Sequence, residues 1–212
     1  MTQDDPIQAQ LIAARRNQIL DAATKVFAEK GFHRATIKDV AKAAGIADGT
    51  IYNYFANKPA LLLGLLDRLN ETEERAMNLQ QVAEGDLQSQ MRSYLQHRFE
   101  IVEAQGLDLL QVMVSELLID AELREQYYRQ ILIPTYALAE ASFEQWKAEG
   151  RIKAMDTVLV TRIISGAFLG LILMRLLGDI ELQKKWNELP DAITEIMLNG
   201  LISNGGANGN DK

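Results

Sequence analysis

Apolar residues recur at helical spacing along most of this chain of 212 residues. Between residues 15 and 30, one face carries Ile19, Ala23, Val26 and Phe27 before Gly31 ends the run. Few segments alternate apolar and polar residues with the period of two that a half-buried strand shows. The pattern therefore predicts an all-α protein with about nine helices and no internal repeat.

Two short predicted helices follow, joined by a tight turn. Thr36 is a good N-cap for the first, because its hydroxyl can accept a bond from an N–H two or three residues further on. Gly45 can take the left-handed conformation that ends this helix. The second helix starts at Ala47 or Asp48 and runs through Phe55. This spacing is typical of a helix-turn-helix, which places its second helix in the major groove of DNA.

The second helix has polar groups on most of its surface. Only Ile51 and Phe55 anchor it, while the two tyrosines, Tyr52 and Tyr54, are free to face outward beside hydroxyl and amide groups. Such groups bond well to phosphate oxygens and base edges. Lys58 follows at the start of the next predicted helix, where it adds charge at the positive end of the helix dipole.

Residues 19–58 resemble the DNA-binding signature of the tetracycline-repressor (TetR) family of bacterial transcription regulators. The residues that carry the resemblance are Ile19 to Ala23, Phe27 to Phe32, Thr36, Ile37, Ile46, Gly49 to Tyr52, Tyr54, Phe55 and Lys58. The resemblance covers the first quarter of the chain, and the remainder is similar to the family only in length and helical character. It implies an N-terminal three-helix helix-turn-helix DNA-binding domain over residues 10–58. A C-terminal helical effector-binding and dimerisation domain then spans residues 59–204, and the polar, glycine-rich residues 205–212 form a disordered tail.

By position against the family pattern, nine residues are expected to contact DNA: Thr36, Lys38, Asp48, Gly49, Thr50, Tyr52, Asn53, Tyr54 and Lys58. Thr50, Tyr54 and Lys58 are expected to bind phosphates, which position the domain without reading the base sequence. Tyr52 and the Gly49 backbone are expected to lie nearest the bases. Lys38 either reaches a guanine edge or a phosphate, or is simply solvated. For Asp48 we favour a helix cap over a contact with cytosine.

The strongest apolar run lies at residues 155–177. Arg162 and Arg175 lie inside it and disfavour a membrane span, so a helix buried between two subunits is the preferred interpretation. Gly166 and Gly170 allow close backbone approach on one face, although ordinary packing within the chain is an alternative. The predicted dimer interface comprises Ile163, Gly166, Gly170, Met174, Ile193 and Met197.

The middle helices, at about residues 87–150, are expected to enclose an effector pocket. Arg98 and Glu116 fall on otherwise apolar faces, where they either contact a ligand or pair with each other. The predicted pocket residues are Arg98, Phe99, Met113, Glu116, Leu117, Tyr127, Phe143 and Phe168. The segment ADGTIYNYF is also similar to the version found in family members that control fatty-acid metabolism, which implies an acyl thioester effector as an alternative to drug-like molecules.

Charge and composition narrow the class of protein. The net charge of −7 divides into +2 for residues 1–58 and −9 for the rest, so only the N-terminal part favours a polyanion. The chain has no cysteine and two histidines, which argues against a disulfide framework, a metal site or a bound cofactor. The sequence shows no nucleophile–base constellation and no glycine-rich phosphate loop, so we expect no enzyme. The polar N-terminus lacks a signal region and favours the cytoplasm.

Together these patterns predict a ligand-responsive repressor that binds a palindromic DNA operator as a homodimer. A small hydrophobic or amphipathic effector shifts the helix at 57–80 like a lever, moves the two DNA-binding heads apart and releases the operator. The alternative is a helix-turn-helix DNA-binding protein whose C-terminal domain binds a protein partner or no ligand.

Overall fold

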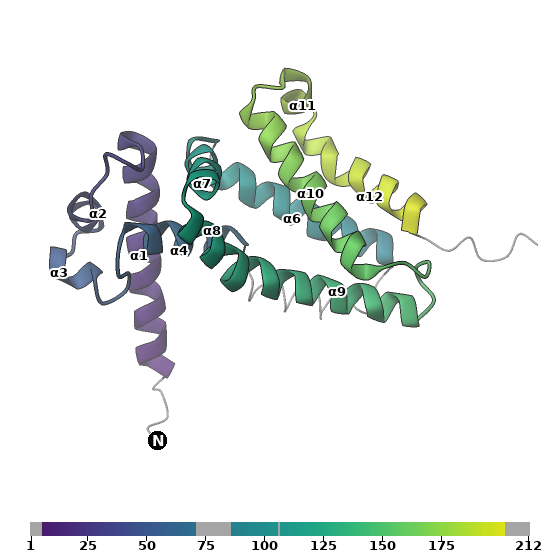
Figure 1. Ribbon diagram of the computed structural model, residues 1–212, viewed down its shortest axis with the longest axis horizontal. Coiled ribbons are helices and arrows are strands. Elements are labelled where there is room, and N and C mark those ends of the chain that lie inside the picture. The colour runs from purple at the N-terminus through teal and green to yellow at the C-terminus, as the bar shows by residue number, and fades with distance from the viewer. Residues whose placement is uncertain (1–5, 71–85, 106, 202–212) are drawn as a thin grey trace, which may run out of the picture. The chain divides into compact units, whose positions relative to one another are not determined.

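The computed structural model describes residues 6–70, 86–105 and 107–201 (Figure 1). The described residues are mostly helical and contain no strand, which confirms the all-α prediction. Residues 6–70, 105 and 107–131 form one compact unit, and residues 86–104 and 132–201 form a second. The predicted end of the 57–80 helix and the predicted tail lie outside the described residues.

The first unit contains six helices within the described ranges. They are α1 (Pro6–Lys30), α2 (Ile37–Ala44), α3 (Asp48–Ile51), α4 (Lys58–Asn70), α7 (Leu107–Ile119) and α8 (Ala121–Tyr127). Helix α2 packs against α1, and α3 packs against α2 (Figure 1). The fully buried side chains of Ile19, Phe27, Ile51 and Leu65 form the centre of this unit. Helix α1 begins at Pro6, well before the predicted start at residue 15.

The division into units differs from the predicted domains, which separate at residues 58 and 59. Helix α4 packs against α1, α7 also packs against α1, and α8 packs against α4. Buried apolar residues of α4, such as Leu61 and Leu62, account for this arrangement, since they cover the apolar face of α1. The predicted DNA-binding domain, residues 10–58 and below called the head, thus lies in the same compact unit as the first helices of the predicted effector domain.

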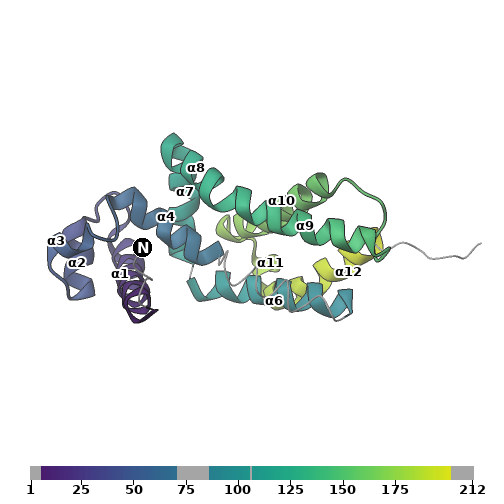
Figure 2. The same ribbon diagram turned by 90° about the horizontal axis from the view of Figure 1, so that it is seen from below.

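The second unit is a separate helical bundle. Its helices are α6 (Leu87–Gln105), α9 (Ile133–Ala148), α10 (Thr157–Leu176), α11 (Ile180–Lys184), the 3-10 turn η3 (Trp186–Glu188) and α12 (Leu189–Leu201). Four of them, α6, α9, α10 and α12, contribute Leu95, Trp146, Val160 and Leu198 to one buried cluster (Figures 1 and 2). The short elements α11 and η3 were not predicted from the sequence.

Several helix ends follow local sequence signals. Gly45 ends α2 at φ +67°, as predicted for a left-handed C-cap. Asp156 caps α10 by accepting bonds from the N–H groups of Val158 and Leu159 at 3.0 and 3.1 Å. A π-helical turn, η2 (Tyr128–Leu132), separates α8 from α9 just before Pro134. Proline lacks an N–H and clashes with the preceding turn, which accounts for the irregular turn at this point.

Candidate nucleic-acid interface

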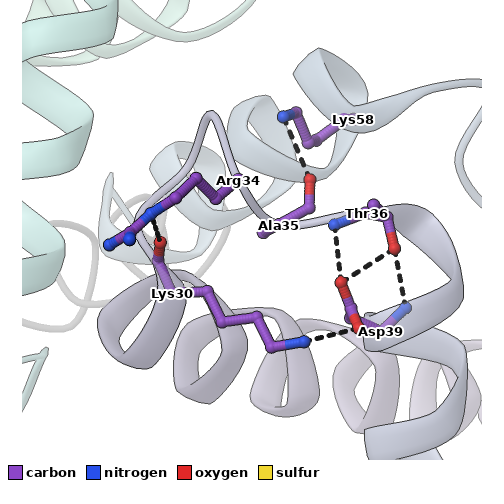
Figure 3. A network of polar contacts seen from close by, with 6 residues as sticks. All are labelled: Lys30, Arg34, Ala35, Thr36, Asp39 and Lys58. Carbon is purple, nitrogen blue, oxygen red and sulfur yellow. Dashed lines mark hydrogen bonds and ion pairs between the residues drawn. The ribbon is translucent and has the colours of Figure 1, made fainter.

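The N-terminus of α2 is fixed by a reciprocal pair of hydrogen bonds (Figure 3). Thr36 Oγ1 accepts from the Asp39 N–H at 3.1 Å, and Asp39 Oδ2 accepts from the Thr36 N–H at 3.0 Å. The Lys30 ammonium donates to Asp39 Oδ1 at 2.6 Å. The bonds from Lys30 and then Thr36 lower the pKa of Asp39 to about 2. Thr36 therefore caps α2, as predicted. The bond between Asp39 and Lys30 also joins the start of α2 to the C-terminal end of α1.

Helix α3 presents an outward polar face on a buried anchor. It is regular only over Asp48–Ile51, but hydrogen bonds from the N–H groups of Tyr54 and Phe55 to the Ile51 carbonyl, both 3.0 Å long, continue the coil to Phe55. Ile51 is fully buried, while Tyr52 is 57% exposed. Asn53 is exposed, and Thr50 and Tyr54 are half-buried. The polar groups that were predicted to contact DNA thus lie on the surface.

Among the residues that the structure describes, neither backbone conformation nor packing requires a glycine at position 49. Its φ lies outside the positive range, and a Cβ built there meets no atom within 4 Å. At Gly64, by contrast, a Cβ would lie 2.8 Å from the Phe55 ring and 3.1 Å from Leu20, so that position requires a glycine for packing. The bare backbone at Gly49 leaves room for a partner outside the chain to approach closely.

The preferred interpretation of Asp48 as a helix cap is wrong. Ala47 is the N-cap of α3 and makes no side-chain capping bond, while Asp48 is the first residue inside the helix. Its exposed carboxylate lies in the first turn, where a negative charge is favoured by the helix dipole. A contact between Asp48 and DNA stays a prediction.

Lys58 has a role inside the protein that the sequence did not indicate. Its ammonium group donates to the carbonyl of Ala35 at 3.1 Å (Figure 3). It also donates to the carbonyls of Phe32 at 2.7 Å and His33 at 3.2 Å, and it lies 4.5 Å from the centroid of the Phe32 ring. Since an ammonium carries three donors, these carbonyls can use all of them. Desolvation lowers the pKa of Lys58, and the charge of Glu116 opposes that shift. The phosphate contact of Lys58 stays a prediction.

A further polar contact joins the turn before α2 to α7. His33 Nε2 lies 3.0 Å from Glu116 Oε1, and the Glu116 side chain is only 8% exposed whereas that of His33 is 74% exposed. From the sequence, Glu116 is expected to contact a ligand or Arg98, and no role is predicted for His33. No local signal reveals this contact, because 83 residues separate the two positions. Of the other predicted pocket residues in this unit, Met113 is buried, and Leu117 and Tyr127 are half-buried.

In the second unit, three of the four predicted pocket residues lie together. Phe99 meets Phe168 edge to face at 5.2 Å between ring centroids, and the Arg98 guanidinium lies 5.9 Å from the Phe168 centroid. Phe143 lies elsewhere, packed on Trp146 at 5.4 Å inside the core cluster of the bundle. Trp186 also joins the first group, at 4.9 Å from Phe99, although the sequence analysis did not single it out.

The predicted interface on α10 is a largely apolar, exposed face. Ile163 is 70% exposed and Met174 is 51% exposed. A Cβ built at Gly166 or Gly170 meets no atom within 4 Å. By length and composition, helix α10 is also apolar enough to cross a membrane. Of its most apolar stretch of 18 residues, 22% is buried inside the protein. The chain itself therefore leaves this face uncovered over the described residues.

Helix α12 contributes less to that face than predicted. Ile193 and Met197 are partly buried against the core cluster of their own unit. Ile196 is instead the outward apolar residue, at 73% exposure. The difference follows from the helical period of about 100° per residue. Ile193 and Met197 lie about 40° apart on the buried side of α12, and Ile196 lies outside that pair, on the flank that faces away from the core.

A capped supporting helix, a glycine turn and an outward-facing polar helix on a packed three-helix head define a helix-turn-helix DNA-binding domain. Residues 19–65 match the family model for bacterial regulatory proteins of the tetR family. Residues 19–65 are thus similar to the DNA-binding domain of this family, and relatives that share this part are named transcriptional regulators.

Relatives are similar in sequence over the head and in structure over most of the chain. The fatty acid metabolism regulator protein of Bacillus subtilis is 48% identical over 59 residues, so the match spans only 27% of this chain and 30% of that protein. The crystal structure of the transcriptional regulator FadR from Bacillus subtilis in complex with stearoyl-CoA is 28% identical, with a TM-score of 0.71 over 86% of this chain and 97% of that one. The fatty acid degradation regulator FadR from Bacillus halodurans is 26% identical, with a TM-score of 0.73 over 87% and 98%.

Proposed function

We propose that this protein is a ligand-responsive transcriptional repressor that binds a palindromic operator as a homodimer. The observation that carries the proposal is the outward face of α3. Ile51 and Phe55 hold this helix in the core, while Tyr52 is exposed and Gly49 has an open backbone. An exposed aromatic hydroxyl beside a bare backbone suits a duplex, whose phosphates and base edges accept hydrogen bonds.

Dimerisation through α10 supports the proposal that the operator is palindromic. One short helix reads only a few base pairs, which is too little to specify a site in a genome. The exposed apolar residues of α10 need a second apolar surface, and a second copy of α10 supplies one by two-fold symmetry. Two heads related by that symmetry read two half-sites of opposite direction.

The proposed effector is a small amphipathic molecule of the acyl type. The relative from Bacillus subtilis was crystallised with stearoyl-CoA and resembles this chain over most of its length. The aromatic residues Phe99 and Phe168 in the second unit offer an apolar surface for such a chain. This assignment rests on similarity and on the type of lining residue.

The coupling between effector and operator runs through α7 in this proposal. Glu116 of α7 pairs with His33, which adjoins the turn that Lys58 holds in place before α2. A displacement of α7 then acts on the head directly, in addition to the lever motion of α4. Glu116→Gln is expected to reduce the effect of the effector on operator affinity. An unchanged effect would argue against this route.

A gel-shift titration tests the proposed DNA surface. The DNA is a fragment selected by the wild-type protein from a random pool, so no operator needs to be known beforehand. Tyr52→Ala is expected to weaken binding by about tenfold or more, because one base or phosphate contact contributes about 1–3 kcal/mol. Tyr128→Ala is the matched control, since Tyr128 is also a half-exposed tyrosine but lies in η2. Equal affinities for both variants would refute the assignment of α3.

A further inference from the structure

An arginine–aromatic cluster in the second unit joins α6, α10 and η3. Trp186 of η3 is 4% exposed and packs on Phe99, which is 3% exposed. The guanidinium of Arg175, near the end of α10, lies 4.2 Å from the centroid of the Trp186 ring. Arg175 therefore stacks on a buried aromatic surface that continues through Phe99 to Phe168.

Two buried hydrogen-bond donors in this cluster lack an acceptor. Over the described residues, neither Arg175 Nε nor Trp186 Nε1 has a hydrogen-bond partner, and neither atom is in contact with solvent. Arg175 does pair with Glu103 through Nη1, but the Glu103 side chain is 55% exposed and leaves Nε unused. Buried donors without partners are rare and costly in native proteins, so adjacent ones call for an explanation.

A second arginine on the same helix shows what is unusual about Arg175. The Arg162 guanidinium lies 3.8 Å from the centroid of the Tyr136 ring and 2.7 Å from Glu140. This is the same combination of arginine, aromatic ring and glutamate. Arg162 is 40% exposed, so water can complete its hydrogen bonds, whereas the Arg175 side chain is 9% exposed.

We propose that Arg175 Nε and Trp186 Nε1 bind the acidic head group of the effector, while Phe99 and Phe168 contact its apolar chain. The inference rests on the proposed function, namely that a small amphipathic molecule controls the protein. Carboxylate and phosphate oxygens only accept hydrogen bonds, and a guanidinium bonds them more strongly than it bonds a neutral oxygen. The shared chemistry is thus an anionic oxygen next to an apolar chain.

Binding at this subsite is coupled to a conformational change. Both nitrogens are covered, so an oxygen reaches them only after a side chain or one of the elements α6, α10 and η3 shifts. A ligand that favours the shifted state increases its population. Because α10 also carries the exposed apolar face, such a shift changes the face that we assign to the dimer.

The test compares four probes on the full chain by titration calorimetry below their aggregation limits. Stearate offers a carboxylate, stearoyl-CoA offers phosphates, stearyl alcohol has the same chain without a charge, and coenzyme A has the phosphates without the chain. Trp186→Phe and Arg175→Lys are expected to weaken binding of stearate or stearoyl-CoA by about tenfold, as expected for losing a bond to a charged group. Both variants are expected to bind stearyl alcohol like the wild type.

Arg162→Lys is the matched control and is expected to bind every probe like the wild type. If Trp186→Phe and Arg175→Lys weaken the binding of only one of the two charged probes, that probe identifies whether the site takes a carboxylate or a phosphate. Equal weakening for stearyl alcohol and the charged probes would mean that the cluster serves packing, and unchanged binding of all probes would also overturn the subsite. A wild-type protein that binds none of the probes would instead refute the amphipathic effector itself.

A fluorescence measurement keeps the proposal testable if a variant fails to fold. The chain has two tryptophans, so Trp146→Phe leaves Trp186 as the single reporter. Saturating stearate or stearoyl-CoA is expected to change the Trp186 emission more than stearyl alcohol does, because an anion then bonds the indole N–H. The same emission with charged and uncharged probes would overturn the proposal.

Discussion

The described residues leave the outward faces of α3 and α10 uncovered, but the chemistry of the two faces differs. The α3 face offers a tyrosine hydroxyl, an amide and a bare backbone at Tyr52, Asn53 and Gly49. The α10 face offers apolar side chains such as Ile163 and Met174, which are 70% and 51% exposed. Polar groups suit a hydrated, charged partner, whereas aliphatic groups gain only from another apolar surface. The two faces therefore fit two different classes of partner.

Glycines reinforce this contrast between covered and uncovered positions. At Gly49, Gly166 and Gly170 an added Cβ meets no atom of residues 6–70, 86–105 and 107–201 within 4 Å. At Gly64 it would meet the Phe55 ring at 2.8 Å. Packing within the chain thus explains the glycine inside the head, while the glycines on the two outward faces are free to serve contacts with a partner.

The largest expected effect comes from placing a charge on the α10 face. Ile163→Lys is expected to convert the dimer to a monomer, since a lysine pair at a symmetric apolar interface loses its hydration and repels. Operator affinity then falls by about a hundredfold or more, because a single head reads too few base pairs. Sedimentation velocity and a gel shift measure both effects.

Leu118→Lys is the control for this charge, since Leu118 is 73% exposed but lies on α7. It is expected to leave the oligomeric state unchanged. An Ile163→Lys protein that stays dimeric would show that another surface holds the two copies together.

The second prediction separates the two kinds of glycine. Gly64→Ala is expected to destabilise the fold by about 1–3 kcal/mol, because the methyl group must displace the buried Phe55 ring. Gly49→Ala is expected to leave stability unchanged or to raise it by up to about 1 kcal/mol, while it weakens operator binding. Urea denaturation and gel-shift titration measure the two quantities. Full operator affinity in Gly49→Ala would mean that no close approach occurs at this backbone.

Local signals allowed the elements of the head to be predicted from the sequence. Thr36 and Gly45 act through bonds to residues a few positions away, so their roles as caps follow from the sequence alone. The buried anchors Ile51 and Phe55 follow from helical spacing in the same way. The apolar character of α10 also follows from the sequence, since residues 155–177 hold its strongest apolar run, and the role of this helix in a dimer stays a prediction.

Contacts between distant segments could not be predicted. Lys58 bonds carbonyls that precede it by 23 to 26 residues, and Glu116 of α7 contacts His33 in the turn before α2. Arg175 and Trp186 come together only because η3 folds back on α10, and η3 itself was missed. In each case the side chain is long and polar, so its partner depends on tertiary structure rather than on spacing along the chain.

The third prediction distinguishes two lysines of the head. Lys58→Met is expected to destabilise the protein by about 1–3 kcal/mol, because it leaves three carbonyls without their charged donor. Lys38→Met is expected to change stability by less than about 0.5 kcal/mol, since Lys38 is exposed. If Lys38 binds a phosphate, its loss also makes operator binding less sensitive to salt. The slope of log affinity against log salt concentration then becomes shallower by about one. Equal stabilities of the two variants would contradict the internal role of Lys58.

The smallest expected effect is the loss at low pH of the stability that Asp39 contributes through the cap of α2. The pKa of Asp39 is about 2 in the folded protein against an ordinary value of 3.8, so the unfolded chain binds the proton more readily. Its stabilising contribution is therefore complete above about pH 5 and is lost as the pH falls through 4 towards 2. The melting temperature of the wild type is expected to exceed that of Asp39→Asn at pH 6, and the difference is expected to shrink between pH 4 and 2.5.

Comparing the two proteins at each pH removes the contribution of the other carboxylates, since both chains carry them. Asp48→Asn is the control, because Asp48 is an exposed acid in the neighbouring helix that makes no capping bond. Its melting temperature is expected to follow the wild type throughout. A difference for Asp39→Asn that stays constant down to pH 2.5 would show that the bonds from Lys30 and Thr36 do not depend on the charge of Asp39.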